Sequence, residues 1–126
     1  MAVLMPNTDT AGSIAWPPLD DRVLDQVVVD YDEVIDYLYV FLAGKPVSAV
    51  WDLRADNTTY VGLRLVADHE WTNEAVAIMI EHFRLVAQVE HPQWGRLLTE
   101  TGDVRRLVLR DFIADVAAMP AATGLS

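Results

Sequence analysis

Residues 72–91 carry apolar side chains around most of their circumference when they are placed on a helix. The remaining positions form one narrow polar strip, consisting of Glu74, Ala77, Glu81, Arg84, Gln88 and His91. A surface helix is apolar on one stripe only, whereas a helix that is apolar nearly all round is buried. The pattern therefore predicts a central helix over residues 72–91, which lies inside the fold or between the fold and a partner.

Strict alternation of apolar and polar residues follows Pro46 and resumes after a turn. Residues 47–54 and 60–67 both show this period of two, which is typical of strands with one buried face. The segment between them, residues 56–59, is rich in turn-forming side chains. We therefore expect an antiparallel hairpin, in which Gly62 marks a bulge or a close backbone approach.

The segment before the hairpin gives mixed signals. Three consecutive valines favour a short strand over residues 23–29. Asp30 and Glu33 then form a capping-box pattern, and Gly44 suits a helix end, so residues 31–43 are predicted as a helix. The same residues are rich in β-branched and aromatic side chains, which leaves a strand as the alternative.

The C-terminal part reads as helical. Residues 93–100 suit a short helix, and apolar residues recur at helical spacing over 104–118. We expect a flexible N-terminal arm over residues 1–18, one domain over 19–118 and a frayed tail over 119–126.

These elements predict an α/β (α+β) fold, with a small, mostly antiparallel sheet of about three strands packed against helices in the order β-α-β-β-α-α-α. Two alternatives follow from the ambiguous segments. If residues 104–112 form a strand, the order becomes ferredoxin-like, β-α-β-β-α-β. The other alternative is the order α-β-β-β-α-α.

Length and composition agree with a single core. The chain has 126 residues, is 52% hydrophobic and has no cysteine, so thiol catalysis and thiolate metal sites are excluded. The N-terminus lacks the basic and apolar regions of a signal peptide, and no apolar run reaches the length of a membrane span. A cytoplasmic protein without a membrane partner is the expectation.

The charge is strongly and unevenly acidic. The formal net charge is −10, and residues 1–36 hold eight of the acidic residues against one arginine. Nucleic acids and anionic membranes are bound mainly through Lys and Arg, so direct nucleic-acid binding is not expected.

The chain offers few residues for chemistry. The histidines lack metal-ligand spacing, so no metal site, cofactor or catalytic residue is predicted. Polar groups cluster at the predicted strand-to-helix junction and on the predicted hairpin. The candidate ligand or polar site consists of Asp52, Arg54, Arg64, His69, Glu70 and Trp71.

The hypothesis that fits best is a small acidic interaction module. A non-catalytic role is favoured over an enzymatic one. The module self-associates, with a dimer favoured, or docks onto a larger protein complex, because surplus apolar surface marks interfaces. The candidate interface residues are Trp16, Ile78, Leu85 and Val89. One alternative is a small enzyme or ligand-binding domain with a cavity lined by Trp51, Tyr60, Phe83 and Trp71. Another is an acidic inhibitor or mimic that acts on a basic protein.

Overall fold

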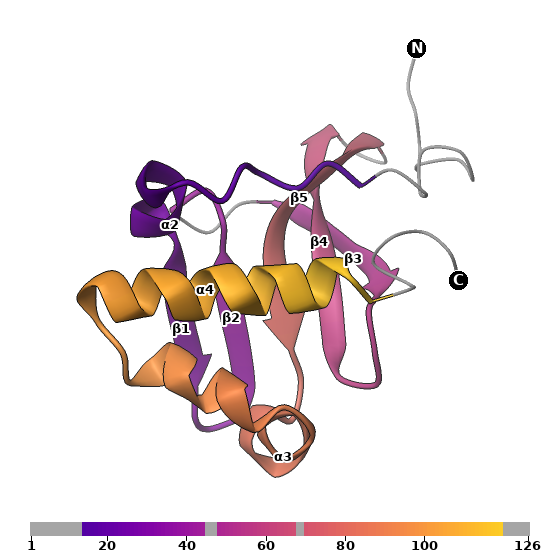
Figure 1. Ribbon diagram of the computed structural model, residues 1–126. Coiled ribbons are helices and arrows are strands. Elements are labelled where there is room, and N and C mark those ends of the chain that lie inside the picture. Colours follow the sequence, from indigo (N-terminus) through magenta and orange to yellow (C-terminus); the bar gives the residue numbers. More distant parts are fainter. Residues whose placement is uncertain (1–13, 45–47, 68–69, 120–126) are drawn as a thin grey trace.

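A five-stranded antiparallel sheet forms the centre of the computed structural model, which describes residues 14–44, 48–67 and 70–119 (Figure 1). The strands are β1 (Val28–Asp32), β2 (Tyr37–Phe41), β3 (Ala49–Arg54), β4 (Thr59–Ala67) and β5 (Glu70–Ile80), in the order β1-β2-β5-β4-β3 across the sheet. Ala15 adds a further, parallel backbone pairing beside β5 at Glu74. The long strand β5 is therefore central and has neighbours on both sides.

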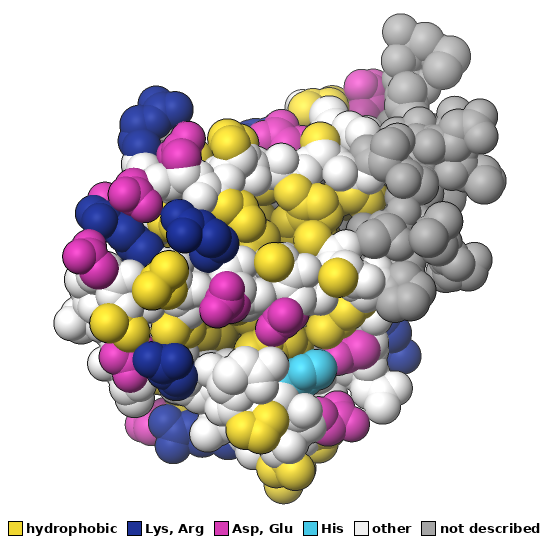
Figure 2. Space-filling view, in the orientation of Figure 1, with side chains coloured by type: hydrophobic (Ala, Val, Ile, Leu, Met, Phe, Trp, Pro, Cys, Tyr) yellow, Lys and Arg dark blue, Asp and Glu magenta, His cyan; other side chains and the backbone are white. Residues whose placement is uncertain are grey.

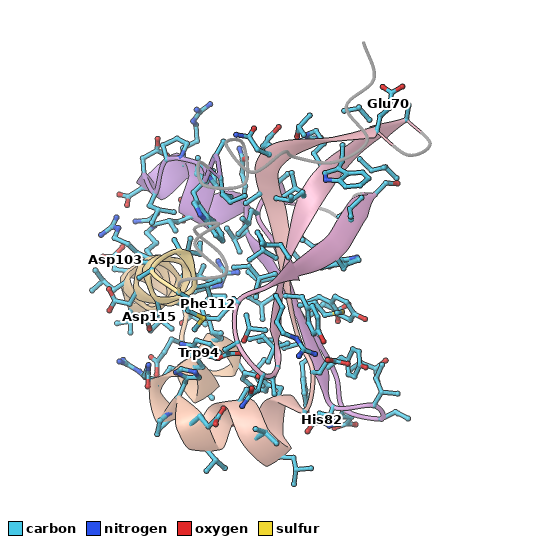
Figure 3. All side chains as sticks on the ribbon, turned by 90° about the vertical axis from the view of Figure 1, so that its right-hand side faces the viewer. Glu70, His82, Trp94, Asp103, Phe112 and Asp115 are labelled. Carbon is cyan, nitrogen blue, oxygen red and sulfur yellow. The ribbon has the colours of Figure 1, made fainter. Side chains whose placement is uncertain are left out.

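Helical segments cover only one face of this sheet. They are α2 (Asp21–Gln26), the π-helix η1 (Phe83–Ala87), α3 (Gln88–Glu90), the 3₁₀-helix η2 (Pro92–Leu98) and α4 (Gly102–Ala117). α4 crosses in front of the strands, and the turned view shows all helices on one side of the sheet (Figures 1 and 3). None of the helices in the described ranges has the length and apolar composition that crossing a bilayer requires.

The core lies between the helices and the covered face. β-strands alternate their side chains between two faces, and here the covered face takes Leu38, Val40, Val61, Ile78 and Ile80, all completely buried. They meet Leu24, Phe83, Trp94, Leu109, Phe112, Ile113 and Val116 from the helical layer, each at most 1% exposed. The outer side of the helical layer carries acidic and basic side chains next to one another (Figure 2), including the ion pair of Arg106 with Asp25.

The prediction of about three strands is wrong, and the predicted central helix is the main reason. Residues 70–80 form β5, and the helical part of the segment begins only at Phe83. His82 separates the two parts, since it adopts the left-handed conformation with φ 51°. A strand that is buried on both faces reads as a continuous apolar run. Ala75, Val76, Ala77 and Ile78 are all buried, so β5 has no alternation to distinguish it from a buried helix.

The helix predicted over residues 31–43 is also wrong, and the strand alternative is confirmed for Tyr37–Phe41, which form β2. The acidic pattern that resembles a helix start belongs to the β1–β2 turn over residues 33–36. There Asp32 accepts a hydrogen bond from the backbone of Val34, and Asp36 has φ 60°. Aspartate tolerates this left-handed conformation, so acids suit such turns as well as helix starts.

The strand predicted over residues 23–29 is displaced. Asp20 caps α2 by accepting a hydrogen bond from Val23 N, and the strand begins at Val28. The observed order is therefore α-β-β-β-β-β followed by helical segments. This excludes the predicted order and both alternatives, because α4 occupies the position of the last ferredoxin-like strand and the third order has two strands too few.

The regularly patterned segments are confirmed. Residues 49–54 and 59–67 pair as the antiparallel hairpin β3–β4, and α4 occupies nearly the predicted range. The register shifts next to Gly62, as expected for a bulge. Of the predicted arm, Trp16 packs against the core, while residues 1–13 and 120–126 lie outside the described part of the chain.

Candidate interaction surface on the open face of the sheet

The face of the sheet without helices carries a group of large side chains. Cross-strand partners in an antiparallel sheet share a face, and Tyr39 and Tyr60 both pair with Met79. Together these positions form what we call the open-face cluster, which consists of Tyr37, Tyr39, Phe41, Trp51, Tyr60 and Met79. Phe41 is buried, with 9% of its surface exposed, and the other members are half-buried. The cluster spans the sheet from β2 to β3.

The rings in this cluster pack against one another. Tyr39 and Phe41 are parallel, with an interplanar angle of 1° and centroids 5.9 Å apart. The indole of Trp51 meets Tyr39 edge-on at 6.5 Å. Tyr37 stands beside Tyr39 at 6.3 Å. Stacked and edge-to-face pairs at such distances are favourable beyond the area that they bury. The cluster is therefore a preformed aromatic surface.

Gly62 explains how Trp51 lies within this surface. A Cβ atom at position 62 would lie 2.9 Å from Cζ3 and 3.0 Å from Cη2 of Trp51. Only glycine leaves room for a ring so close to the backbone. The indole of Trp51 therefore lies across β4 and closes the gap between Tyr39 and the β3 edge.

Two polar contacts tie the aromatic hydroxyls to charged groups. The Tyr37 hydroxyl donates a hydrogen bond of 2.8 Å to Glu81, which raises the pKa of Tyr37 and lowers that of Glu81. Arg54 donates to the Tyr60 hydroxyl and has its Cζ 5.0 Å from the centroid of the Tyr60 ring. A cation over an aromatic face is attracted by the ring. These contacts hold the rim of the cluster in place.

Charges of opposite sign lie at opposite edges of the open face. On the β1 side, the exposed Asp30 and Asp32 pair with Tyr39 and Tyr37. On the other side, β3 and β4 contribute Arg54 and Arg64. Arg64 forms a bidentate salt bridge with Glu74, with nitrogen–oxygen distances of 2.9 and 3.2 Å. The open face thus has an acidic edge at β1, an aromatic centre, and Arg54 on the opposite edge strand β3 with Arg64 on the neighbouring strand β4.

The structure divides the predicted polar site. Arg54 and Arg64 lie on the open face, whereas Glu70 and Trp71 begin β5 at the far end of the sheet, where Glu70 is labelled in Figure 3. Trp71 packs against the core. The side chain of Asp52 and the whole of His69 lie outside the described part of the chain.

The predicted interface residues lie in three places. Ile78 is completely buried in the core, and Trp16 is half-buried against that core. Leu85 and Val89 are 72% and 71% exposed, on η1 and α3 away from the open face. The four residues therefore do not form one surface.

The residues predicted to line a cavity between sheet and helices lie on two different faces of the sheet. Phe83 is buried in the core on the covered face, whereas Trp51 and Tyr60 belong to the open-face cluster. A shallow surface pocket of about 360 Å³ lies beside η1 and η2. It is lined by Arg84, Gln88, Val89, Gly95, Leu98 and Thr99.

Sequence reasoning missed most of the open-face cluster. Tyr37, Tyr39 and Phe41 alternate with Leu38 and Val40, which is the period of a strand with two apolar faces. That alternation was the available signal, but the helix expected over residues 31–43 obscured it.

Comparison of the chain with protein families, curated proteins and solved structures gives no match. The functional assignment therefore rests on the geometry of the molecule.

Proposed function

We propose that the protein is an interaction module that forms a homodimer, with the open face of one copy packed on the open face of another. The observation that carries the proposal is the open-face cluster, an aromatic surface that no described helix covers. Exposed apolar patches with polar rims mark interaction sites, and Tyr and Trp dominate the binding energy of interfaces.

The charge layout supports a second copy of the chain as the partner. A twofold axis that runs parallel to the strands between two facing sheets places β1 of one copy over β3 of the other. Asp30 and Arg54 lie at the same level of the sheet, through the pairs Asp30–Tyr39, Tyr39–Met79, Met79–Tyr60 and Tyr60–Arg54, so Asp30 then faces Arg54 of the second copy at both edges. An interface built around a twofold axis must be self-complementary in this way. The alternative axis, across the strands, would place acidic β1 on acidic β1.

Face-to-face packing also suits the shape of the sheet. Facing antiparallel sheets pack about 10 Å apart, with side chains from both faces interdigitating. The flat stack of Tyr39 and Phe41, together with the Trp51 ring, provides such side chains at the centre. The polar rim contributes orientation more than affinity, because exposed ion pairs are worth ~1 kcal/mol or less.

The test is sedimentation velocity of the purified chain over a wide range of concentrations. We expect a dimer that dissociates on dilution, and a monomer for Tyr39→Glu, because a buried unpaired carboxylate at the centre of the interface is unfavourable. Leu85→Glu is the matched control, since Leu85 is a large, exposed apolar residue outside the open face, and the variant should leave the dimer intact. A wild type that stays monomeric, or a dimer that Leu85→Glu abolishes, contradicts the proposal.

A charge exchange tests the orientation of the two copies. Asp30→Arg alone should weaken the dimer, and adding Arg54→Asp should restore it. Raising the salt concentration should strengthen the dimer of two chains that each carry −10, because long-range repulsion is screened while apolar contact is retained. Docking on a basic partner would show the opposite salt dependence.

A further inference from the structure

Three potential metal ligands meet at the lower end of the helical layer, away from the open face. Asp56 belongs to the β3–β4 turn, and Glu90 and His91 lie at the end of α3. One ligand atom of each residue lies within 4.8 Å of the other two. His91 Nε2 and Asp56 Oδ2 are 3.2 Å apart. The chain therefore brings an imidazole and two carboxylates together from segments that are far apart in the sequence.

The Asp56 carboxylate is held with one oxygen directed to the histidine. Its Oδ1 accepts hydrogen bonds from the backbone N–H groups of Thr58 at 3.0 Å and Thr59 at 2.9 Å. This arrangement occupies Oδ1 and leaves Oδ2 for His91 Nε2. Partners that fix a ligand in this way are typical of metal sites.

The imidazole of His91 is equally fixed. Its ring stacks on the indole of Trp94, with centroids 3.9 Å apart and an interplanar angle of 14°. Trp94 is buried and meets Phe112 edge-on, and both are labelled in Figure 3. The packed core thus sets the plane in which Nε2 points. The side chains of His91 and Asp56 are each 26% exposed, so an ion from solution can reach them.

A buried hydroxyl beside the cluster lacks a partner. Thr59 is completely buried, and its Oγ1 makes no hydrogen bond. The backbone N–H of Thr59 donates to Asp56 Oδ1, so this buried residue lies directly beside the carboxylate. A buried polar atom without a partner is unfavourable, and a water bound to a cation would supply that partner.

A plain Asp–His hydrogen bond does not account for the whole arrangement. It leaves the Glu90 carboxylate next to that of Asp56, and like charges at short range repel. Among the described residues, no Lys or Arg forms an ion pair with either carboxylate. A divalent cation neutralises both carboxylates and uses the imidazole as well.

We propose that Asp56, Glu90 and His91 bind a divalent transition-metal cation, with Zn²⁺ the ion that fits best. Imidazole favours Zn²⁺ over Mg²⁺ and Ca²⁺, which prefer oxygen ligands alone. Around an ion with ligands at ~2.0–2.2 Å, neighbouring ligand atoms lie about 3.0–3.5 Å apart. The 3.2 Å between His91 Nε2 and Asp56 Oδ2 fits this spacing. Three protein ligands leave at least one position for water.

The test is titration of the full chain with ZnCl₂ by isothermal calorimetry, supported by the visible spectrum of bound Co²⁺. We expect one ion per chain. His91→Gln and Glu90→Gln should each weaken binding by at least about tenfold, because loss of even an outer partner of a metal site has an effect of ~10–100-fold. His82→Asn is the matched control, since it removes a histidine outside the cluster and asparagine tolerates the left-handed backbone there.

The outcomes separate the alternatives. Glu90 is exposed, so Glu90→Gln should fold normally, which circular dichroism checks. The proposal is overturned if the wild type shows no saturable Zn²⁺ binding. It is also overturned if His82→Asn weakens Zn²⁺ binding as much as His91→Gln does. Because Trp94 stacks on His91, Co²⁺ should quench its fluorescence, and Trp94→Phe should remove most of that response. Sedimentation of Glu90→Gln should still show the dimer, which separates this site from the open face.

Discussion

The two faces of the sheet are built from the same strands but differ in what stabilises them. The covered face buries branched aliphatic residues completely, and residues such as Val40 share one core cluster with Phe112 of α4. The open face instead packs large aromatic rings against one another and leaves them half-buried. One face gives the fold its stability, and the other keeps apolar surface available for a partner. Substitutions on the two faces should therefore separate stability from association.

The largest expected effect lies on the covered face. Phe112→Ala should reduce the free energy of unfolding by about 3–5 kcal/mol, because Phe112 is 1% exposed and its removal leaves a cavity next to Trp94. Denaturant unfolding of wild type and variant measures this difference. A loss below ~1 kcal/mol would show that the helical layer is not the main source of stability.

An intermediate effect is expected at Gly62 on the open face. Gly62→Ala introduces a Cβ that must displace the Trp51 ring, because it would lie 2.9 Å from that ring. Overpacking of this kind reduces the free energy of unfolding by ~1–3 kcal/mol. We expect a value at the lower end of this range, because the Trp51 ring can move outward. The dimer should weaken more clearly than the fold, which sedimentation together with thermal unfolding would reveal. A variant that loses stability and still dimerises like wild type would mean that Trp51 is not part of the interface.

The smallest effect concerns two carboxylate–tyrosine pairs, one on each face. Burial raises the pKa of Asp36, but hydrogen bonds from Arg84 N, the Tyr31 hydroxyl and Leu85 N hold this pKa below its ordinary value of 3.8. On the open face, the Tyr37 hydroxyl lowers the pKa of Glu81. A folded pKa below the unfolded value stabilises the protein above the unfolded pKa, and this stability is lost as the pH falls through the folded pKa.

Both pairs should therefore stabilise the protein at neutral pH and lose this effect below about pH 4. The free energy of unfolding should decrease on acidification, and both variants should make this decrease smaller. Asp36→Asn should have a larger effect than Glu81→Gln, because the Asp36 carboxylate accepts hydrogen bonds from two backbone N–H groups at the N-terminus of η1. Chemical denaturation at several pH values between 7 and 3 measures both slopes. Equal slopes for the two variants would mean that these backbone contacts add nothing.

The comparison of the faces also explains what the sequence predicts well. The β3–β4 hairpin and α4 each have one apolar and one polar side, so their hydrophobic period identifies them directly. β2 and β5 are apolar on both sides, because their open-face positions are aromatic on β2 and are Ala77 and Met79 on β5. Their pattern loses the period of two, and β5 then resembles a buried helix.

The candidate sites could be predicted only in part. Arg54 and Arg64 were recognised on the hairpin, because pairing in a hairpin follows from the turn between its strands. The open-face cluster requires β2 to lie beside β5, and the metal cluster requires Asp56 to meet His91, 35 residues later. Such non-local contacts carry no spacing signal, since the tertiary fold alone brings these residues together.

The strand order has a consequence for how the chain folds. Among the five described strands, three of the four pairings join consecutive strands, and the pairing of β2 with β5 joins strands that are distant in sequence. Hairpins form in microseconds, whereas distant pairings wait for the closure of the intervening chain. The β3–β4–β5 meander and the β1–β2 hairpin can thus form early, and their union is the slow step. Until then the inner edge of β5 is exposed, and it is the part of the folding chain most open to pairing with another molecule.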